Sequence, residues 1–460
     1  MKHIHLIGIG GTGMSSIARV LLEKGYTVSG SDRNPSTLAQ DLQRVGAQIS
    51  AGHSESNIHG ADIVVRSSAI PDDNVEVQAA LKAGIPVLKR SDFLSTLMEG
   101  QDGIAIAGTH GKTTTTAMLA YALYSLDYDP SYILGGVSKN LGTNAHAGKG
   151  RYFVIEADEY DRMFLGLTPQ VILVTNVEYD HPDIYPNPAN YHAVFEQFIG
   201  CLKPGGLLIT NFDDPGSTTL ANFLPQGARA FSCGLKAGAD YRAENIKSNT
   251  IGGSTFLVTF GAENKKREPL TVVSLQLPGE HNVRNALAVI AALHQLSVPV
   301  QQASQNLAEF KGTGRRFDIV GEANGITVID DYAHHPTKIR ATLAAARSRF
   351  PIRRLVAVWQ PHTFSRTELL ANEFIDALSN ADLVLITEVY AAREKSDNFS
   401  AKSLVEKIDK ENVIFTPTIA AATDYLLWHL VPGDVLVVLS AGDADQICFN
   451  VLNKLKERNG

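Results

Sequence analysis

The sequence predicts an α/β fold divided into three domains, and three observations support this prediction. The chain has 460 residues, which at roughly 100–200 residues per domain suggests about three domains. Hydrophobic residues make up 44% of the chain, enough to fill several large cores. Short apolar runs alternate with helical patterns along the sequence, which is typical of α/β units built on mostly parallel sheets.

The first domain is expected over residues 1–102, where a short polar break at 100–102 ends the unit. Its apolar runs are short enough for strands, and its helical patterns have one apolar face. The predicted elements are strands at 3–8, 26–30, 63–65 and 86–88 and helices at 14–24 and 92–98.

The second domain is expected over 103–313 and the third over 314–460, joined by a glycine-containing linker at 311–314 that is a candidate hinge. Period-two patterning at 241–277 predicts antiparallel strands beside an otherwise parallel sheet. In the second domain we also expect strands at 104–107, 152–155, 171–175 and 207–210 and helices at 114–125 and 283–296. In the third we expect strands at 327–329, 355–359, 383–386 and 435–439.

The charge and cysteine content limit the possible partners. The chain carries 41 Lys and Arg against 48 Asp and Glu, a formal charge of −7, which argues against a protein that coats nucleic acid. No apolar run approaches the roughly 18 residues of a membrane span, and no signal-peptide pattern opens the chain. Cys201, Cys233 and Cys448 show no metal-ligand spacing and cannot all pair. We expect a cytoplasmic monomer or weak homodimer with no membrane insertion.

The first glycine loop lies between the first predicted strand and helix. Gly8, Gly10, Gly11 and Gly13 form a G-x-G-x-x-G pattern, and Asp32 follows at the end of the next strand. Glycines permit the tight turn, and the free amides at the helix start favour a diphosphate. This pattern fits NAD or a UDP-sugar equally, and a close strand–helix crossing without a ligand is the structural alternative.

The second glycine loop follows a buried strand and opens a helix. Its backbone amides can wrap phosphates, Lys112 can neutralise their charge, and the Thr113 hydroxyl can hold Mg²⁺. The standard pattern has glycine where this chain has Ile106, so the loop departs from that form. The predicted phosphate-binding residues are Gly108, Thr109, His110, Gly111, Lys112, Thr113 and Thr114.

Candidate metal ligands follow the next strands of the second domain. Glu156 ends the strand at 152–155, and a carboxylate there is suited to Mg²⁺. Asp161 follows it and is as well explained as a solvated acid. His181 follows the neighbouring strand and can reach a second metal or a phosphate, although a lone loop histidine often has no such role. Asp213 and Asp214 are interpreted as a turn.

Two further groups of polar residues stand at element ends. Asn282 can cap the helix that follows it, and His281 and Asn285 lie at the same end, where they can face an adenine. In the third domain, Arg315 and Arg316 suit an anion between domains. The loops after two predicted strands carry the remaining candidates, which suit a small amino acid better than zinc: Asp330, Asp331, Tyr332, His334, His362 and Arg366.

These motifs together resemble the Mur ligase family, and within it the ligases that add L-alanine. The resemblance covers essentially the whole chain, and the order and spacing of its motifs are far more specific than any single loop. Its most specific pieces are 7–16, 108–116, 156–161, 176–181, 279–285, 330–336, 360–366 and 440–443.

The resemblance implies a Rossmann-like UDP-binding domain, a central P-loop ATPase-like domain with a mixed sheet, and a Rossmann-like C-terminal domain that binds the amino acid. It implies that ATP, with Mg²⁺, drives the coupling of L-alanine to UDP-N-acetylmuramate through an acyl phosphate. In this scheme Lys112, Glu156, His181, Asp331 and His334 are catalytic. The implied UDP-sugar site contains Gly8, Gly10, Gly11, Gly13, Met14, Ser15, Asp32, Ser67 and Ser68.

Three departures from the family pattern affect the interpretation. Thr363 stands where alanine-adding relatives usually have arginine, which leaves Arg366 to hold the amino-acid carboxylate alone. The tyrosine at position 160 of the acidic motif is similar to that of the related ligase that attaches a recycled murein peptide. Some Mur ligases carry a carbamylated lysine on the helix after the histidine; this chain has none there, and Glu196 is a speculative substitute.

Two alternatives from other classes remain at this point. An NAD(P)-dependent oxidoreductase would use the first glycine loop but would leave the loop at 108–114 and Glu156 unexplained. A nucleotide-gated binding protein would bind ATP without turnover.

Overall fold

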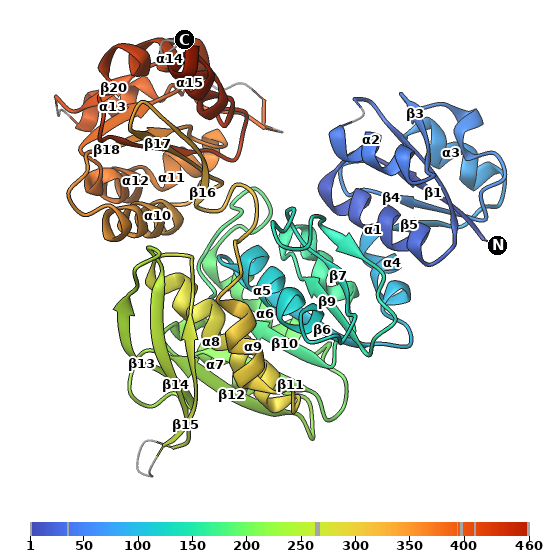
Figure 1. Ribbon diagram of the computed structural model, residues 1–460. Coiled ribbons are helices and arrows are strands. Elements are labelled where there is room, and N and C mark those ends of the chain that lie inside the picture. Colours follow the sequence, from blue (N-terminus) through green and yellow to red (C-terminus); the bar gives the residue numbers. More distant parts are fainter. Residues whose placement is uncertain are drawn as a thin grey trace.

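The computed structural model describes residues 2–34, 36–262, 267–392, 394–395, 399–408 and 411–457. It contains three sheets, each covered by helices, which confirms the predicted α/β class (Figure 1). Strong β-formers in short apolar runs produce the strands, and nearly all of the central strands are buried on both faces.

The N-terminal sheet is parallel throughout, in the order β3-β2-β1-β4-β5. The sequence order of the strands reverses beside β1. Ligands of such sheets usually bind at the carboxyl ends of the strands at this point. The strands are β1 (His3–Ile7), β2 (Thr27–Asp32), β3 (Gln48–Ala51), β4 (Ile63–Arg66) and β5 (Val87–Lys89). The helices are α1 (Thr12–Glu23), α2 (Thr37–Arg44), η1 (Glu55–Ile58), α3 (Val75–Lys82) and α4 (Arg90–Leu97).

The middle sheet has ten strands in the order β15-β14-β13-β12-β11-β10-β6-β9-β7-β8. Its centre is parallel, and the predicted antiparallel strands extend the same sheet at one edge. The parallel centre and its neighbours are β6 (Asp102–Ala107), β7 (Ser131–Ile133), β8 (Ala145–His146), β9 (Tyr152–Glu156), β10 (Val171–Val174), β11 (Leu207–Asn211) and β12 (Arg229–Gly234). The antiparallel edge is β13 (Tyr241–Ser248), β14 (Ser254–Phe260) and β15 (Glu268–Ser274).

Helices cover both faces of the middle sheet. On one face pack α5 (Lys112–Tyr124), α8 (Glu280–Gln295) and α9 (Val300–Leu307). On the other face the hydrophobic core is continuous with that of the N-terminal domain, because α1 and α4 pack there beside α6 (Pro188–Ile199). The short elements η2 (Tyr160–Gly166), α7 (Pro215–Thr219) and η3 (Leu220–Phe223) complete this unit.

The C-terminal sheet has the order β16-β17-β21-β18-β19-β20, with β16 antiparallel to the rest. Its strands are β16 (Asp318–Ala323), β17 (Ile326–Asp331), β18 (Leu355–Trp359), β19 (Leu383–Ile386), β20 (Val413–Phe415) and β21 (Val435–Leu439). One face is covered by α10 (Pro336–Arg349), α12 (Ala371–Ala377), η4 (Leu378–Asn380) and α13 (Lys402–Ile408), and the other by α14 (Ile419–His429) and α15 (Gln446–Glu457). The short helix α11 (Phe364–Leu369) follows β18.

The linker predicted as a hinge is tied to the middle domain by backbone hydrogen bonds. The amide of Lys139 donates to the Gly312 carbonyl, the amide of Gly314 donates to the Val137 carbonyl, and Thr313 is fully buried. Residues 312–314 are therefore held in place on the middle domain. In the part of the chain that the structure describes, no helix combines the length and apolar character of a membrane span.

Candidate active site

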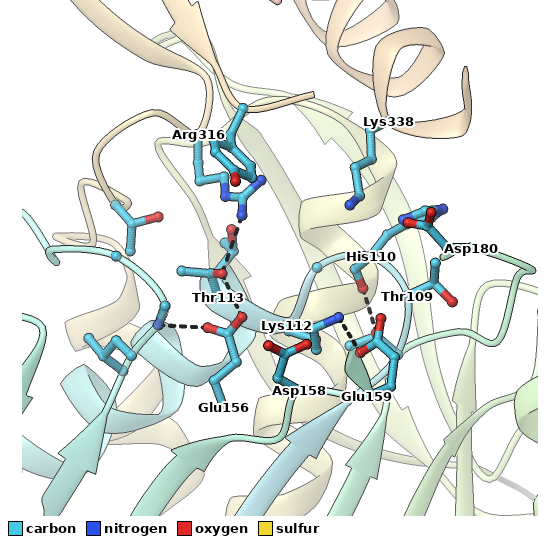
Figure 2. Close-up of a pocket in the computed structure, with 18 of the residues that line it drawn as sticks. Thr109, His110, Lys112, Thr113, Glu156, Asp158, Glu159, Asp180, Arg316 and Lys338 are labelled. Carbon is cyan, nitrogen blue, oxygen red and sulfur yellow. Dashed lines mark hydrogen bonds and ion pairs between the residues drawn. The ribbon is translucent and has the colours of Figure 1, made fainter. Parts of the chain in front are cut away.

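A cavity of about 1040 Å³ opens between the domains and is lined by residues from all three. It lies over the carboxyl ends of β6, β9 and β10, where parallel strands deliver their loops to one edge of the sheet (Figure 2). The phosphate loop, the acidic segment after β9 and the loop after β17 all contribute to its wall.

The second glycine loop forms the floor of this cavity. α5 begins at Lys112, two residues earlier than predicted, with Gly111 at its N-cap in a left-handed conformation (φ +81°). No side chain caps the helix, so its first amides are free to meet phosphate oxygens. A Cβ on Gly108 would lie 2.2 Å from the Thr175 hydroxyl, and glycine is required there.

Lys112 forms a buried ion pair with Glu159. The Nζ–Oε2 distance is 2.6 Å, and the Glu159 side chain is fully buried. Burial opposes both charges, but their mutual attraction outweighs it, raising the pKa of Lys112 and lowering that of Glu159 to about 2. The Tyr191 hydroxyl also donates to Glu159. Glu159 lies in the acidic segment after β9 but was not among the residues predicted for the site.

Thr113 and Glu156 lie together on the other side of Lys112. The Thr113 hydroxyl donates to Glu156 Oε1 at 3.0 Å, and the Gly135 amide donates to Oε2 at 2.7 Å. Burial raises the pKa of Glu156. A hydroxyl and a carboxylate facing a phosphate loop are the hard oxygen donors that Mg²⁺ prefers, so these two residues fit that ion.

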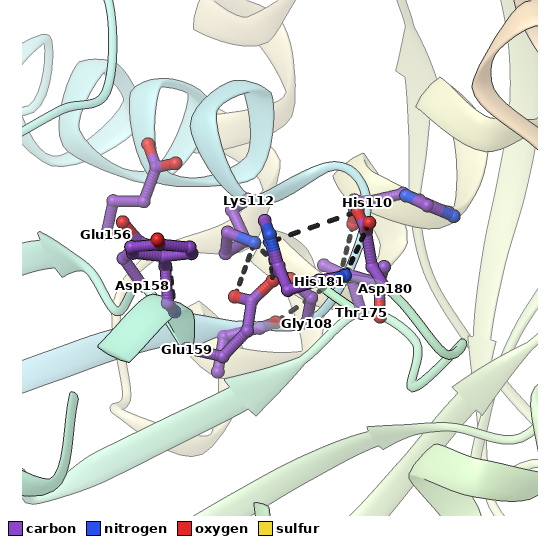
Figure 3. Close-up of polar contacts among 12 residues, drawn as sticks. Gly108, His110, Lys112, Glu156, Asp158, Glu159, Thr175, Asp180 and His181 are labelled. Atoms are coloured by element: carbon purple, nitrogen blue, oxygen red, sulfur yellow. Dashed lines mark hydrogen bonds and ion pairs between the residues drawn. The ribbon is translucent and has the colours of Figure 1, made fainter. Parts of the chain in front are cut away.

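His181 does not join this pair. Its Nε2 lies 3.5 Å from Glu159 Oε1, while its Nδ1 is buried without a hydrogen-bond partner. Figure 3 shows Glu156 on one side of the Lys112 ammonium and His181 with Asp180 on the other. The predicted metal set of Thr113, Glu156 and His181 is therefore divided into two positions along the phosphate loop.

A second cluster joins the middle and C-terminal domains. The His110 Nε2 lies 2.7 Å from Glu178, and the Thr337 hydroxyl donates to the same carboxylate at 2.6 Å. His335 adds a third potential metal ligand. Its Nδ1 accepts the Thr337 amide and caps α10, which leaves the proton on Nε2. That tautomer cannot ligate a metal through Nε2, so the cluster is better explained as an interdomain contact.

Arg366 is engaged by a carboxylate of the middle domain. Its Nε and Nη2 both donate to Asp180 Oδ1, at 2.9 and 2.7 Å, and both side chains are almost fully buried. Burial opposes the Asp180 charge, but Arg366 outweighs it and holds the pKa of Asp180 well below its usual range. His362 accepts from the remaining Arg366 nitrogen at 3.3 Å. Arg366 thus already binds a carboxylate in this structure.

The loop after β17 supplies two different kinds of residue. Both oxygens of Asp331 accept backbone amides, from Phe317 and Ala333, so this carboxylate fixes the loop. His334 Nδ1 donates to the Tyr332 carbonyl at 2.8 Å, which leaves Nε2 as a free proton acceptor. Burial and nearby cations keep the pKa of His334 well below its usual value, so the ring is neutral.

The structure separates Asp330 from the other predicted nucleotide residues. Successive residues of a strand face opposite ways, so Asp330 points away from the cavity and lies 3.3 Å from Arg315. Burial raises its pKa to about 7. Arg316 does reach the cavity: it lies over the Tyr332 ring and donates to the Thr113 hydroxyl at 3.4 Å.

The start of α8 lines the far end of the cavity. His281, Asn282 and Asn285 are all present there, as predicted from the sequence. The prediction that Asn282 caps the helix is wrong: α8 begins at Glu280, so Asn282 lies inside the first turn and donates back to the Pro278 carbonyl. Asp213 and Asp214 lie in a turn as expected, and both also line the cavity.

The first glycine loop reaches the cavity only at its end: Thr12 and Gly13 line it, whereas Gly8, Gly10, Gly11 and Asp32 do not. The Gly10 amide donates to Asp32 at 3.0 Å, and the Asn34 amide donates to the other Asp32 oxygen. Arg90 lies so close to Gly13 that a Cβ there would be 1.8 Å from its Nη1. Arg90 lines the cavity, and its Nε is buried without a partner. Arg90 was not among the residues predicted for the site.

The other residues of the predicted UDP-sugar site differ in exposure. Met14 and Ser15 are buried within α1, Ser67 lies against Gly8, and Ser68 is exposed. Gly8 has the positive φ (+82°) that its tight turn requires. The backbone amide of Gly11 closes this turn by donating a hydrogen bond to the Gly8 carbonyl.

Four residues that line the cavity have a strained backbone conformation. His181, Arg315, Phe317 and Thr363 all line it and all have positive φ, although none is glycine. Thr363 is β-branched, which makes its φ of +66° especially unfavourable. Strain of this kind accumulates at functional sites. Glu196 lies elsewhere: it contacts His192 on its own helix and does not line the cavity.

Comparisons with known proteins agree across the whole chain. Three family models match: Mur ligase family, catalytic domain (3–102), Mur ligase middle domain (106–293), and Mur ligase, glutamate ligase domain (315–442). The UDP-N-acetylmuramate–L-alanine ligase of Roseiflexus sp. (strain RS-1) is 44% identical, covering 99% of this chain and 100% of that protein. The protein of the same name from Geobacter sulfurreducens is 43% identical, with 99% and 98% covered.

Two solved structures are similar over their full lengths. The UDP-N-acetylmuramate–alanine ligase of Thermotoga maritima has a TM-score of 0.83 and 29% identity, covering 100% of both chains. A murein peptide ligase from Psychrobacter arcticus has a TM-score of 0.73 and 28% identity, covering 99% of both.

Proposed function

The chain belongs to the Mur ligase family, and we propose that it couples L-alanine to UDP-N-acetylmuramate, with ATP as the energy source, in peptidoglycan precursor synthesis. It is an ATP-dependent ligase. The observation that carries this proposal is the single cavity in which a phosphate loop, an oxygen pair suited to Mg²⁺ and the His334–Arg366 region of another domain meet.

Thr113 and Glu156 would hold Mg²⁺. His181 would contact a second ion or a phosphate oxygen. When bound, Mg²⁺ neutralises charge on the phosphate oxygens. Lys112 and the first amides of α5 add positive charge at the same point. Arg90 supplies a further cation at the side from which the sugar acid approaches.

The first chemical step activates the acid. A carboxylate oxygen of UDP-N-acetylmuramate attacks the terminal phosphorus of ATP, the bond to ADP breaks, and an acyl phosphate forms. The carboxylate and the triphosphate repel each other, so the step needs the cations that surround the cavity. Closure of the domains over the site would keep water from the acyl phosphate.

The second step forms the amide. The alanine nitrogen attacks the acyl carbon, and phosphate leaves as the tetrahedral intermediate collapses. His334 Nε2 is free and neutral, so it accepts the proton that the nitrogen loses. Asp331 positions the loop that carries His334. Arg366 binds the alanine carboxylate once it releases Asp180.

The diphosphate of the sugar nucleotide is assigned to the first glycine loop. Both oxygens of Asp32 accept backbone amides, from Gly10 and Asn34, so this carboxylate helps to hold the turn. The three Mur ligase family models argue against the oxidoreductase alternative. We also assign the protein to the cytoplasm because Cys201, Cys233 and Cys448 are all free thiols. A monomer or weak homodimer stays a prediction.

Phosphate release tests the proposed function. The purified protein is given Mg²⁺, ATP and UDP-N-acetylmuramate with alanine, glycine, serine or a murein tripeptide in turn. We expect release that requires the sugar nucleotide and is fastest with L-alanine. Tripeptide as the preferred amine would instead favour the murein-peptide alternative, for which Tyr160 in the cavity wall is the supporting observation.

A further inference from the structure

Lys338 lines the same cavity but takes no part in the steps described above. It lies in the first turn of α10, and its ammonium group points from that helix toward the phosphate loop, across the cavity from Lys112 (Figure 2). Within the described ranges, this ammonium has no hydrogen bond and no salt bridge. An unpartnered cation facing a phosphate loop requires an explanation.

The position of Lys338 is electrostatically unfavourable. The first turn of a helix carries the positive end of the helix dipole, which disfavours a cation. Asp180 attracts the ammonium, but that carboxylate already accepts two hydrogen bonds from Arg366. The charged and titratable groups facing Lys338 from the surrounding elements are His110, Lys112, Glu178, Asp180, Arg316, His334, His335 and Arg366.

Resting on the function proposed above, we propose that Lys338 binds the terminal phosphoryl group of ATP from the third domain, opposite Lys112. Lys112, Arg316, Arg366 and Lys338 concentrate positive charge that an arriving polyanion can offset. An ammonium group has three donors for phosphate oxygens. The transferring group is then held between two lysines from different domains. Lys338 thereby links nucleotide binding to the placement of the amino-acid domain.

This role has a consequence for pH dependence. Burial, with added repulsion from the neighbouring cations, lowers the pKa of Lys338 to about 7. Only the charged form binds phosphate well, so binding takes up a proton wherever the free lysine is neutral. Above pH 7 the charged fraction falls about tenfold per pH unit, and the apparent affinity for the terminal phosphate falls in proportion.

Calorimetry on the full-length protein tests the proposal. The probes are the magnesium complexes of adenylyl imidodiphosphate, which has a terminal phosphate, and of ADP, which lacks it. The variants are Lys338→Met, which removes the charge, and Lys338→Arg, which keeps it at every pH. Arg340→Met is the matched control, because Arg340 lies on the same helix but is exposed and paired with Asp376.

We expect Lys338→Met to bind adenylyl imidodiphosphate about ten- to a hundredfold more weakly than the unchanged protein, with ADP affinity unaffected. Between about pH 6 and about pH 8, the unchanged protein should lose about tenfold in affinity relative to Lys338→Arg. Comparing the two proteins cancels the ionisation of the nucleotide itself. Arg340→Met should behave as the unchanged protein.

Equal affinity of Lys338→Met and the unchanged protein for adenylyl imidodiphosphate would overturn the proposal. So would equal losses for ADP and the analogue, or a defect confined to alanine, because each would place Lys338 elsewhere. Thermal melting of the variants separates misfolding from lost contact, and Lys338→Arg retains the shape. Failure of the proposed function is a different result: the unchanged protein would release no phosphate with both substrates, while the binding comparison remains decisive.

Discussion

The two walls of the cavity differ in how their charges are satisfied. On the middle-domain wall, Lys112 pairs with Glu159, and Thr113 contacts Glu156, all within one domain. On the C-terminal wall, Lys338 has no salt bridge among the described residues, and Arg366 pairs with Asp180 of the other domain. The first wall is complete before any ligand arrives. On the second wall Arg366 is already paired, and Lys338 is the cation for which a substrate would supply the partner.

This difference shows how a multidomain ligase can combine binding with closure. A preformed phosphate wall costs no reorganisation when the nucleotide binds. A wall with an unpaired cation favours anionic ligands that reach it, so such a ligand adds to the contacts that already join the two domains. Substituting residues on each wall should therefore give different mixtures of lost stability and lost activity.

The largest effect is expected from Lys112→Met on the middle wall. Phosphate release should fall about a thousandfold or more, because a cation at the transferring phosphate is lost. The free energy of unfolding should fall by about 3 kcal/mol, since Glu159 is left buried without its partner. Steady-state kinetics and chemical denaturation measure the two effects. Adding Glu159→Gln should restore stability but not activity; near-normal turnover in either variant contradicts the assignment.

On the opposite wall, Arg366→Met should act on the amino acid. The KM for L-alanine is expected to rise about ten- to a hundredfold, because a charge-assisted contact to its carboxylate is removed. The KM for ATP should stay nearly constant. Initial rates over a range of alanine concentrations provide the measurement. In the single variant, Asp180 stays buried without its partner. The double variant Arg366→Met with Asp180→Asn removes this charge. If the KM for L-alanine is unchanged in the double variant, the amino-acid site lies elsewhere.

A smaller effect is expected from Glu156→Gln. The amide oxygen can still accept from Thr113 or Gly135, so the melting temperature should hardly change. The concentration of Mg²⁺ needed for half-maximal nucleotide binding should rise at least about tenfold, because an anionic ligand is lost. A Mg²⁺ titration at fixed nucleotide checks this. If the half-maximal Mg²⁺ concentration is unchanged, the ion does not bind at Thr113 and Glu156.

Much of the middle wall could be predicted from the sequence. A loop that contains glycines, a lysine and a threonine indicates a phosphate site, because adjacent residues determine both its geometry and its chemistry. Glu156 was also predictable, because a carboxylate at the end of a neighbouring parallel strand must reach the same edge. Glu159 lay only three residues further, but no local pattern shows that it turns back toward Lys112.

The C-terminal wall was less predictable because its geometry depends on how domains pack. The sequence suggested Arg366 for a substrate carboxylate, yet nothing local indicates that Asp180 fills this position from another domain. Lys338 was missed for the same reason. Pro336 after two histidines is a recognisable helix start, but the surroundings of its first turn come from distant segments. Helices α10 and α15 and the small strands β7 and β8 also went unpredicted.

The most direct test of the account follows oxygen atoms through the reaction. UDP-N-acetylmuramate carrying ¹⁸O in its carboxylate is incubated with the protein, Mg²⁺, ATP and L-alanine, and the released phosphate is analysed by mass spectrometry. If the carboxylate attacks the terminal phosphorus, one labelled oxygen must pass to the phosphate when the amide forms. Phosphate released without the label, alongside normal product, would contradict activation of the acid by phosphorylation.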